Sequence, residues 1–287
     1  MARTHVEGAL ERAGNQAEQA VRSAVRNPWV ERLARFGYAA RGVVYAVIGL
    51  LAVQAASSGR SAGRQAGPEG AIQRIAEQSR LLLALVAIGL VGYALWRFVQ
   101  AVLDPENKGT DPKGLAKRGM MLASGIGYST LALFAARIVS GSGRGDSGGG
   151  NQEAAASLMD KPFGRWLVIL AGIAVIVSGF YQLYEAWTDR FRRHFKLQEM
   201  DHSEERLATH TGRLGLASRG IVFLLMGWFL IQAGLRYDPG QASGLAGALE
   251  ALATQPYGPW LLGIVAFGLI AYGAYSFLEA RYRRIVF

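Results

Sequence analysis

The chain has 287 residues, of which 51% are hydrophobic and 18% are charged, and its formal net charge is +10. An average soluble domain carries about 25% charged residues, and a disordered chain is poor in apolar ones, so this composition excludes a single soluble domain and disorder alike. The chain has no cysteine, which excludes a disulfide framework, a thiolate metal site and a cysteine nucleophile.

The first 31 residues form a polar arm. Its apolar residues, among them Val6, Leu10 and Val21, follow helical spacing with charges between them. They are too scattered to form the apolar core of a signal peptide. We therefore expect residues 1–31 to be a cytoplasmic arm, with a weak amphipathic helix that lies on the membrane surface and ends at Asn27 and Pro28.

Six apolar segments follow the arm and are separated by polar stretches. Each has about 20 residues, the length of a helix that crosses the roughly 30 Å hydrocarbon core of a bilayer. The expected spans are 36–56, 81–103, 119–139, 166–188, 214–236 and 260–280. The sequence therefore predicts an all-α integral membrane protein with six transmembrane helices.

Lysines and arginines are distributed unevenly about these spans. The segments on the side of both termini hold 21 of them, and the segments on the other side hold 8. Because basic residues accumulate in cytoplasmic loops, we expect both termini to be cytoplasmic. The positive charge is then explained by topology and by contact with anionic lipid headgroups, and we expect no nucleic-acid partner.

The six spans repeat one pattern three times. The odd spans share a glycine, with an arginine seven residues before it and an aromatic residue three residues after it. The glycines are Gly42, Gly125 and Gly220, and the arginines are Arg35, Arg118 and Arg213. The even spans share an aromatic residue at Trp96, Tyr181 and Tyr275. Two even spans also begin with a Pro-aromatic-Gly-x-Trp motif, at 162–166 and 256–260.

Each repeat predicts a hairpin of two spans, with a short surface helix before the second span, as at 248–253. The hairpins cover residues 32–108, 109–198 and 199–287, and all three enter the membrane in the same direction. Parallel repeats are related by an axis along the membrane normal. We expect one membrane domain of six helices with pseudo-threefold symmetry, and short interfacial helices beside it.

The chain resembles a known family in these motifs. The threefold hairpin, the Arg-Gly-x-x-aromatic pattern and the Pro-aromatic-Gly-x-Trp pattern are similar to bacterial multipass proteins of the domain-of-unknown-function 1206 family. The resemblance covers about residues 32–284. It implies the repeated helical fold and a location in the bacterial plasma (inner) membrane, and it brings no established activity with it.

Polar residues inside the spans are the candidates for function, because they are costly in a bilayer. An inner layer reads, repeat by repeat, Arg41 with Gln100, Ser124 with Glu185, and Arg219 with Glu279. An outer layer consists of Gln54, Arg137 and Gln232. An ion pair in the inner layer would offset the burial of both charges. Two interpretations stay open: these side chains join helices or reach the headgroups, or the inner layer is a polar gate on the central axis.

Two further patterns resemble active or metal sites. Residues 145–149 read Gly-Asp-Ser-Gly-Gly, as in the nucleophile segment of serine proteases, but no histidine is placed to act as the base. His194, His202 and His210 are eight residues apart in one expected loop and do not share a helix face. We expect a solvated loop there, no metal or cofactor, and no enzymatic activity.

The main functional hypothesis is that a small solute, an ion or a lipid binds or passes at the polar layer on the pseudo-threefold axis. The alternative is a non-transporting membrane scaffold or accessory subunit that acts through protein partners or as a homo-oligomer. Transport requires a wet cavity on the axis, whereas a scaffold requires a dry core.

Overall fold

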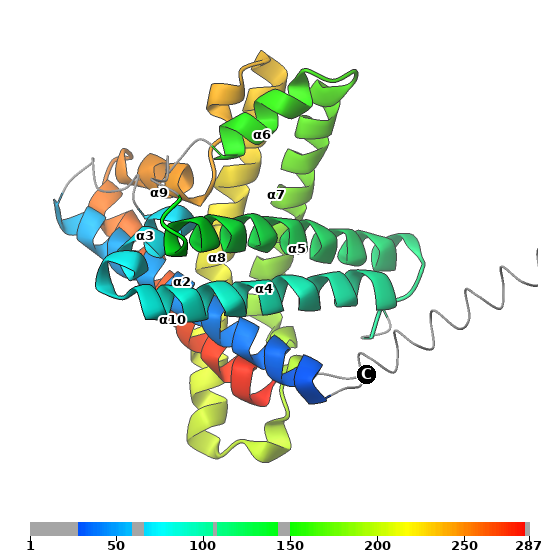
Figure 1. The fold of residues 1–287 in the computed structure, drawn as a ribbon, viewed down its shortest axis with the longest axis vertical. Helices are drawn as coiled ribbons and strands as arrows, with labels where there is room; N and C mark the ends of the chain where they lie inside the picture. Colours follow the sequence, from blue (N-terminus) through cyan, green and yellow to red (C-terminus); the bar gives the residue numbers. More distant parts are fainter. Residues whose placement is uncertain (1–27, 59–65, 106–107, 143–149, 285–287) are drawn as a thin grey trace, which may run out of the picture.

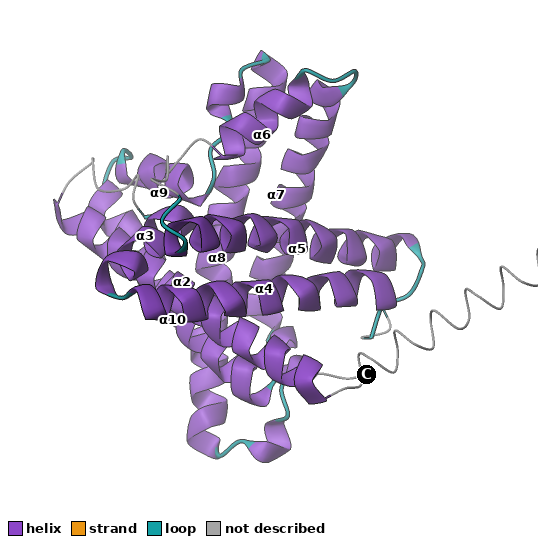
Figure 2. Cartoon of the chain, in the orientation of Figure 1, coloured by secondary structure: helices purple, strands orange, loops and turns teal. Residues whose placement is uncertain are grey.

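The computed structural model describes residues 28–58, 66–105, 108–142 and 150–284. The amphipathic helix expected in the N-terminal arm lies outside these residues, and so does the Gly-Asp-Ser-Gly-Gly segment. Across the described ranges the chain forms helices joined by turns and contains no strand (Figure 2). The all-α class predicted from the sequence is confirmed.

Six long helices match the six expected spans, and each is long and apolar enough to cross a membrane. They are α2 (Pro28–Ser58), α4 (Arg80–Leu103), α5 (Pro112–Val139), α7 (Gly164–Thr188), α8 (His202–Arg236) and α10 (Gly258–Tyr282). The first span of each hairpin, which is α2, α5 or α8, begins well before its apolar part. For α8 the reason is a capping box, in which the Asp201 carboxylate accepts from the backbone N–H of Glu204, and the Glu204 side chain accepts from that of Asp201.

Three short helices, as expected, precede the even spans. They are α3 (Pro68–Gln78), α6 (Gly150–Met159) and α9 (Leu245–Ala253). The turns that follow α6 and α9 contain the Pro-aromatic-Gly motif, with Phe163 and Tyr257 in the left-handed backbone region. A Cβ on the next residue would lie 1.7 Å from a carbonyl oxygen at Gly164 and 2.1 Å from one at Gly258. The motif is therefore a tight turn that only glycine fits.

The outer faces of the long helices are apolar. On α4 the exposed positions include Leu81, Leu85 and Ile88, and on α7 they include Leu170 and Phe180. Apolar surface of this extent on a soluble protein would cause aggregation, whereas in a bilayer it contacts lipid. The protein is a multipass membrane protein.

The repeats pack on one another through three junctions: α10 with α2, α4 with α5, and α7 with α8. Figure 1 shows them as three helix pairs that cross each other. Each junction joins the second span of one repeat to the first span of the next, and the α10–α2 junction joins the third repeat to the first. The spans of one hairpin pack less closely, and α5 and α7 of the second repeat pack least.

Small residues form each junction at equivalent positions. A Cβ on Gly42 of α2 would lie 3.0 Å from the carbonyl oxygen of Gly273 on α10. A Cβ on Gly220 of α8 would lie 2.9 Å from that of Gly179 on α7, and Gly125 of α5 faces the Phe98 ring of α4. These are the glycines that define the repeat in the sequence. Close backbone approach is their role, as is usual between membrane helices.

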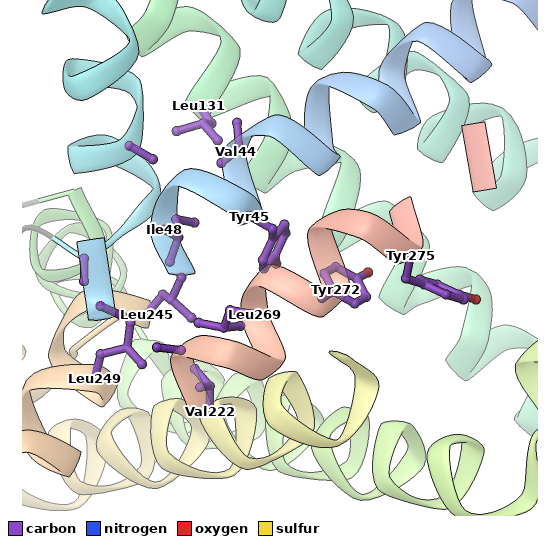
Figure 3. Close-up of a cluster of buried hydrophobic side chains, with 14 of the residues drawn as sticks. Val44, Tyr45, Ile48, Leu131, Val222, Leu245, Leu249, Leu269, Tyr272 and Tyr275 are labelled. Atoms are coloured by element: carbon purple, nitrogen blue, oxygen red, sulfur yellow. The ribbon is translucent and has the colours of Figure 1, made fainter. Parts of the chain in front are cut away.

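The core lies where the three pairs meet. Its side chains come from all three repeats, with Val44 and Ile48 on α2, Leu131 on α5, Val222 on α8 and Leu269 on α10. In Figure 3, Tyr45 of α2 lies beside α10, with Leu269 and Tyr272 close to it. Because the three junctions connect the repeats in a closed circle, we call their arrangement the ring of repeats. Packed apolar and aromatic side chains fill the centre of this ring.

Candidate functional site

One arginine of each repeat binds at the C-terminal end of the neighbouring repeat's second span. Arg35 binds at the end of α10, Arg118 at the end of α4 and Arg213 at the end of α7. Arg35 donates to the carbonyl oxygen of Ala280 at 3.0 Å, and Arg118 donates to that of Ala101 at 2.8 Å. Unpaired carbonyls at a helix C-terminus attract cations. These arginines therefore stabilise the junctions and are not candidates for ligand binding.

At the third of these positions Arg213 binds a side chain instead of a carbonyl oxygen. Its Nε lies 2.6 Å from Asp189, the residue that follows α7. The hydrogen bond from Arg213 lowers the pKa of the Asp189 carboxyl group, because it favours the charged form. The α7–α8 junction is thus closed by an ion pair outside the spans.

Arg41 lies in the α10–α2 junction and is almost fully buried, with 2% of its surface exposed. Its guanidinium group donates to Tyr93 Oη at 2.6 Å, to Ser276 Oγ at 3.0 Å and to the Glu279 carboxylate. The ring of Tyr38 lies 4.9 Å from its central carbon. Every nitrogen of this guanidinium has an acceptor, so the protein itself neutralises and solvates Arg41.

Glu279 also accepts from Arg283, the residue that caps the end of α10. The sequence paired Glu279 with Arg219 of the same repeat, and that pairing is wrong. Glu279 is instead paired with Arg41 across the repeat junction, because α10 packs more closely on α2 than on α8.

Arg97 on α4 belongs to the same polar cluster and was missing from the predicted layer. Its Nε lies 2.9 Å from Tyr93 Oη, and its Nη1 lies 3.0 Å from Gln100 Oε1. Tyr93 therefore accepts from both Arg41 and Arg97. Gln100, expected opposite Arg41, is instead an acceptor for Arg97.

Arg219 on α8 is partly buried and has uncharged partners. It donates to Gln182 Oε1 at 2.9 Å, to Tyr45 Oη at 3.1 Å and to Tyr272 Oη at 3.3 Å. The ring of Phe223 lies 4.5 Å from its central carbon. Within the described part of the chain no carboxylate lies within 4.0 Å of its guanidinium nitrogens.

Arg41 and Arg219 have two partners at equivalent positions of the repeat. Tyr93 and Tyr272 are equivalent in the repeat, and so are Ser276 and Gln182. Each arginine therefore contacts a tyrosine of its own repeat and a short polar side chain of the preceding one. In the second repeat Ser124 takes the place of the arginine, and Arg97 of the preceding first repeat takes the place of Gln182 and Ser276. We call Arg41, Arg97 and Arg219 the arginine layer.

The structure does not join the other predicted residues to this layer. Ser124 is partly buried, and Glu185 accepts from Tyr181 Oη at 3.0 Å. In the outer layer Gln54 and Arg137 are exposed and Gln232 is partly buried. No hydrogen bond connects the side chains of these three within the ranges that the structure covers. They do not form a common outer site there.

The loop expected at the histidines is wrong because the three residues lie in helices, although His202 and His210 are exposed to solvent as expected. His194 lies in the 3-10 helix η2 (Arg190–His194), and His202 and His210 lie in the first turns of α8. Hydropathy locates only the apolar part of α8, whereas the Asp201 cap sets its true start. No group of three metal-ligand side chains occurs among the residues described.

The chain matches a family model three times. The model, "Domain of Unknown Function (DUF1206)", covers residues 36–104, 120–189 and 214–283. The chain belongs to the DUF1206 family. Each DUF1206 match ends at the residue that caps an even helix, namely Asp104, Asp189 or Arg283. One DUF1206 unit thus contains one odd and one even span.

A curated relative aligns with nearly the whole chain. It is the "Uncharacterized protein YxxB" of Bacillus subtilis (strain 168), which is 35% identical over 260 residues. The alignment covers 90% of this chain and 93% of the relative. No solved structure matches this DUF1206 chain.

Proposed function

We propose that this DUF1206 protein binds a small solute, an ion or a lipid headgroup at the arginine layer and passes it across the bacterial plasma membrane, with both termini in the cytoplasm. The observation that carries the proposal is Arg219, a partly buried arginine whose guanidinium donates to uncharged side chains. Charged side chains within spans are expensive in lipid and usually mark ligand or ion paths. The distribution of lysine and arginine supports the orientation.

A scaffold is the second candidate function. The packed core at the centre of the ring and the complete set of acceptors around Arg41 favour it. In a scaffold the arginine layer would join helices, and protein partners or further copies of the chain would contact the outer faces. The two functions differ in whether water reaches Arg219.

Cysteine labelling tests this difference, since the natural chain has no cysteine. Phe223→Cys places a thiol beside Arg219 and keeps the arginine. In nanodiscs, which leave both membrane faces open to solvent, we expect a membrane-impermeant methanethiosulfonate reagent to modify this thiol. The fully buried Ile48→Cys should stay unmodified, and Gln255→Cys, in the exposed turn before α10, should react completely.

Arg219→Cys provides a second readout at the same place. If both thiols are as unreactive as that of Ile48→Cys in a protein that elutes normally from a size-exclusion column, the solute-binding proposal is wrong. The scaffold would then be the supported function.

A further inference from the structure

We propose that Arg219 binds an oxyanion, a phosphate or carboxylate group carried by a lipid headgroup or a soluble anion. This inference rests on the proposed function and names its ligand class. It starts from the charges of the buried cluster. Of its four guanidinium groups, those of Arg41 and Arg283 bind the carboxylate of Glu279. Those of Arg97 and Arg219 donate to uncharged side chains among the described residues. A cluster with this excess of positive charge attracts anions.

The hydrogen bonds single out one of the three arginines of the layer. All three guanidinium nitrogens of Arg41 donate to protein acceptors, and so do all three of Arg97. Arg219 uses Nε and Nη1, and its Nη2 has no acceptor among the described residues. Arg219 therefore retains donors for a ligand.

The repeat shows which protein group is missing at Arg219. Glu279 binds Arg41 in the α10–α2 junction, and the equivalent residue in the α7–α8 junction is Glu185. Glu185 accepts from Tyr181 and forms no ion pair with Arg219 within 4.0 Å in the described chain. An anionic ligand at Arg219 would take the role that Glu279 has for Arg41.

The surroundings of Arg219 suit an oxyanion. The rings of Phe223 and Tyr272 lie 4.5 Å and 5.1 Å from its central carbon and hold the guanidinium plane. Tyr45 and Tyr272 accept through their oxygens, so each hydroxyl keeps its own proton to donate. A planar guanidinium with two neighbouring hydroxyl donors matches the geometry of carboxylate and phosphate groups.

This anion could come from two sources. Gln182, the partner of Arg219, belongs to α7, and α7 packs least closely on α5, the other span of its hairpin. A lipid headgroup could approach laterally between these helices, and a soluble anion could approach from the aqueous side. The chemistry at Arg219 is the same for both.

The test measures thermal unfolding of the purified full chain in phosphatidylcholine nanodiscs. One arm adds inorganic phosphate against chloride at equal ionic strength, and the other replaces part of the lipid with phosphatidylglycerol. We expect a higher Tm in at least one arm. Arg219→Gln should weaken the apparent affinity at least tenfold, and Tyr272→Phe, which keeps the ring, should weaken it less. Arg213→Gln on the same helix is the matched control and should respond like the natural chain.

A shift with phosphate alone identifies a soluble anion, and a shift with phosphatidylglycerol alone identifies a headgroup. No shift in either arm, or an equal shift in Arg219→Gln, overturns the oxyanion site. The labelling of Phe223→Cys separates the two levels of the proposal. A reactive thiol without any anion effect leaves solute binding in place and removes the oxyanion, whereas an unreactive thiol without any anion effect removes both.

Discussion

Arg41 on α2 and Glu279 on α10 form a buried ion pair that joins the first repeat to the third, 238 positions later in the chain. No peptide connection holds these two helices together at their junction. The pair, the serine at 276 and the close contact of Gly42 with Gly273 do so instead. In the other two junctions the packed helices follow one another in the chain, so a loop also joins α4 to α5 and α7 to α8.

Removal of the Glu279 charge should destabilise the protein strongly. Glu279→Gln leaves Arg41 and Arg283 without their carboxylate inside the cluster. Loss of one partner of a buried pair costs about 3–5 kcal/mol. Unfolding in mixed detergent micelles measures this change. Glu185→Gln, at the equivalent and partly buried position, should change stability much less, and equal losses in the two variants would contradict the assignment of Glu279.

The Tyr93 hydroxyl should contribute to stability through two arginines. It accepts from Arg41 at 2.6 Å and from Arg97 at 2.9 Å. Tyr93→Phe keeps the ring and leaves buried donors without an acceptor, which costs about 1–3 kcal/mol. The same unfolding assay applies. A variant as stable as the natural chain would show that water or another acceptor replaces the hydroxyl.

Alanine substitutions should distinguish the turn glycine from a helix glycine on α10. A Cβ on Gly258 would lie 2.1 Å from the carbonyl oxygen of Ala253, whereas one on Gly263 would meet nothing within 4 Å. We expect Gly258→Ala to destabilise the protein by about 1–3 kcal/mol through overpacking. Gly263→Ala should leave stability unchanged or raise it by up to about 1 kcal/mol. Thermal unfolding of both variants measures the difference, and a destabilised Gly263→Ala would refute this account.

The ion pair between Asp189 and Arg213 should make stability depend on pH in acid. The folded protein lowers the pKa of Asp189 below its usual value of 3.8. A depressed carboxyl pKa adds stability above the unfolded pKa, and that stability is lost as the pH falls through the folded pKa. The stability difference between the natural chain and Asp189→Asn should be constant at pH 5–7 and shrink progressively as the pH falls below about 4. Arg213→Gln should show the same loss, and a gap that widens in acid would reverse the sign of the argument.

The sequence was sufficient for the spans, the short helices and the repeat. Hydropathy and the glycine at Gly42, Gly125 and Gly220 are local signals, and the junction contacts confirm their register. Helix starts were less well predicted, because a cap such as Asp201 can extend a helix beyond its apolar part. That extension is also why His202 and His210 were misplaced.

The partners in the arginine layer could not be predicted in the same way. A repeat in the sequence does not say whether a span packs more closely on its own hairpin partner or on the neighbouring repeat. Arg41 binds Glu279 because α2 packs most closely on α10, which belongs to the neighbouring repeat. Arg97 was missed because its equivalents, Gln182 and Ser276, are uncharged. A search for one arginine in each junction would have found it. In the α4–α5 junction Ser124 stands at the position of Arg41 and Arg219, and Arg97 supplies the arginine instead. Gln54 and Arg137 proved exposed because rotation about a helix axis is poorly determined by hydropathy.

The α10–α2 junction has the architecture of the other two and lacks a covalent link, so the ring of repeats has no intrinsic first member. The α10–α2 junction is one of three equivalent places where such a ring could be opened. A circular permutant that joins the end of α10 to the start of α2 by a linker and opens the loop between α4 and α5 should therefore fold to the same ring. The three repeats would then keep the same neighbours in space although their order along the chain had changed.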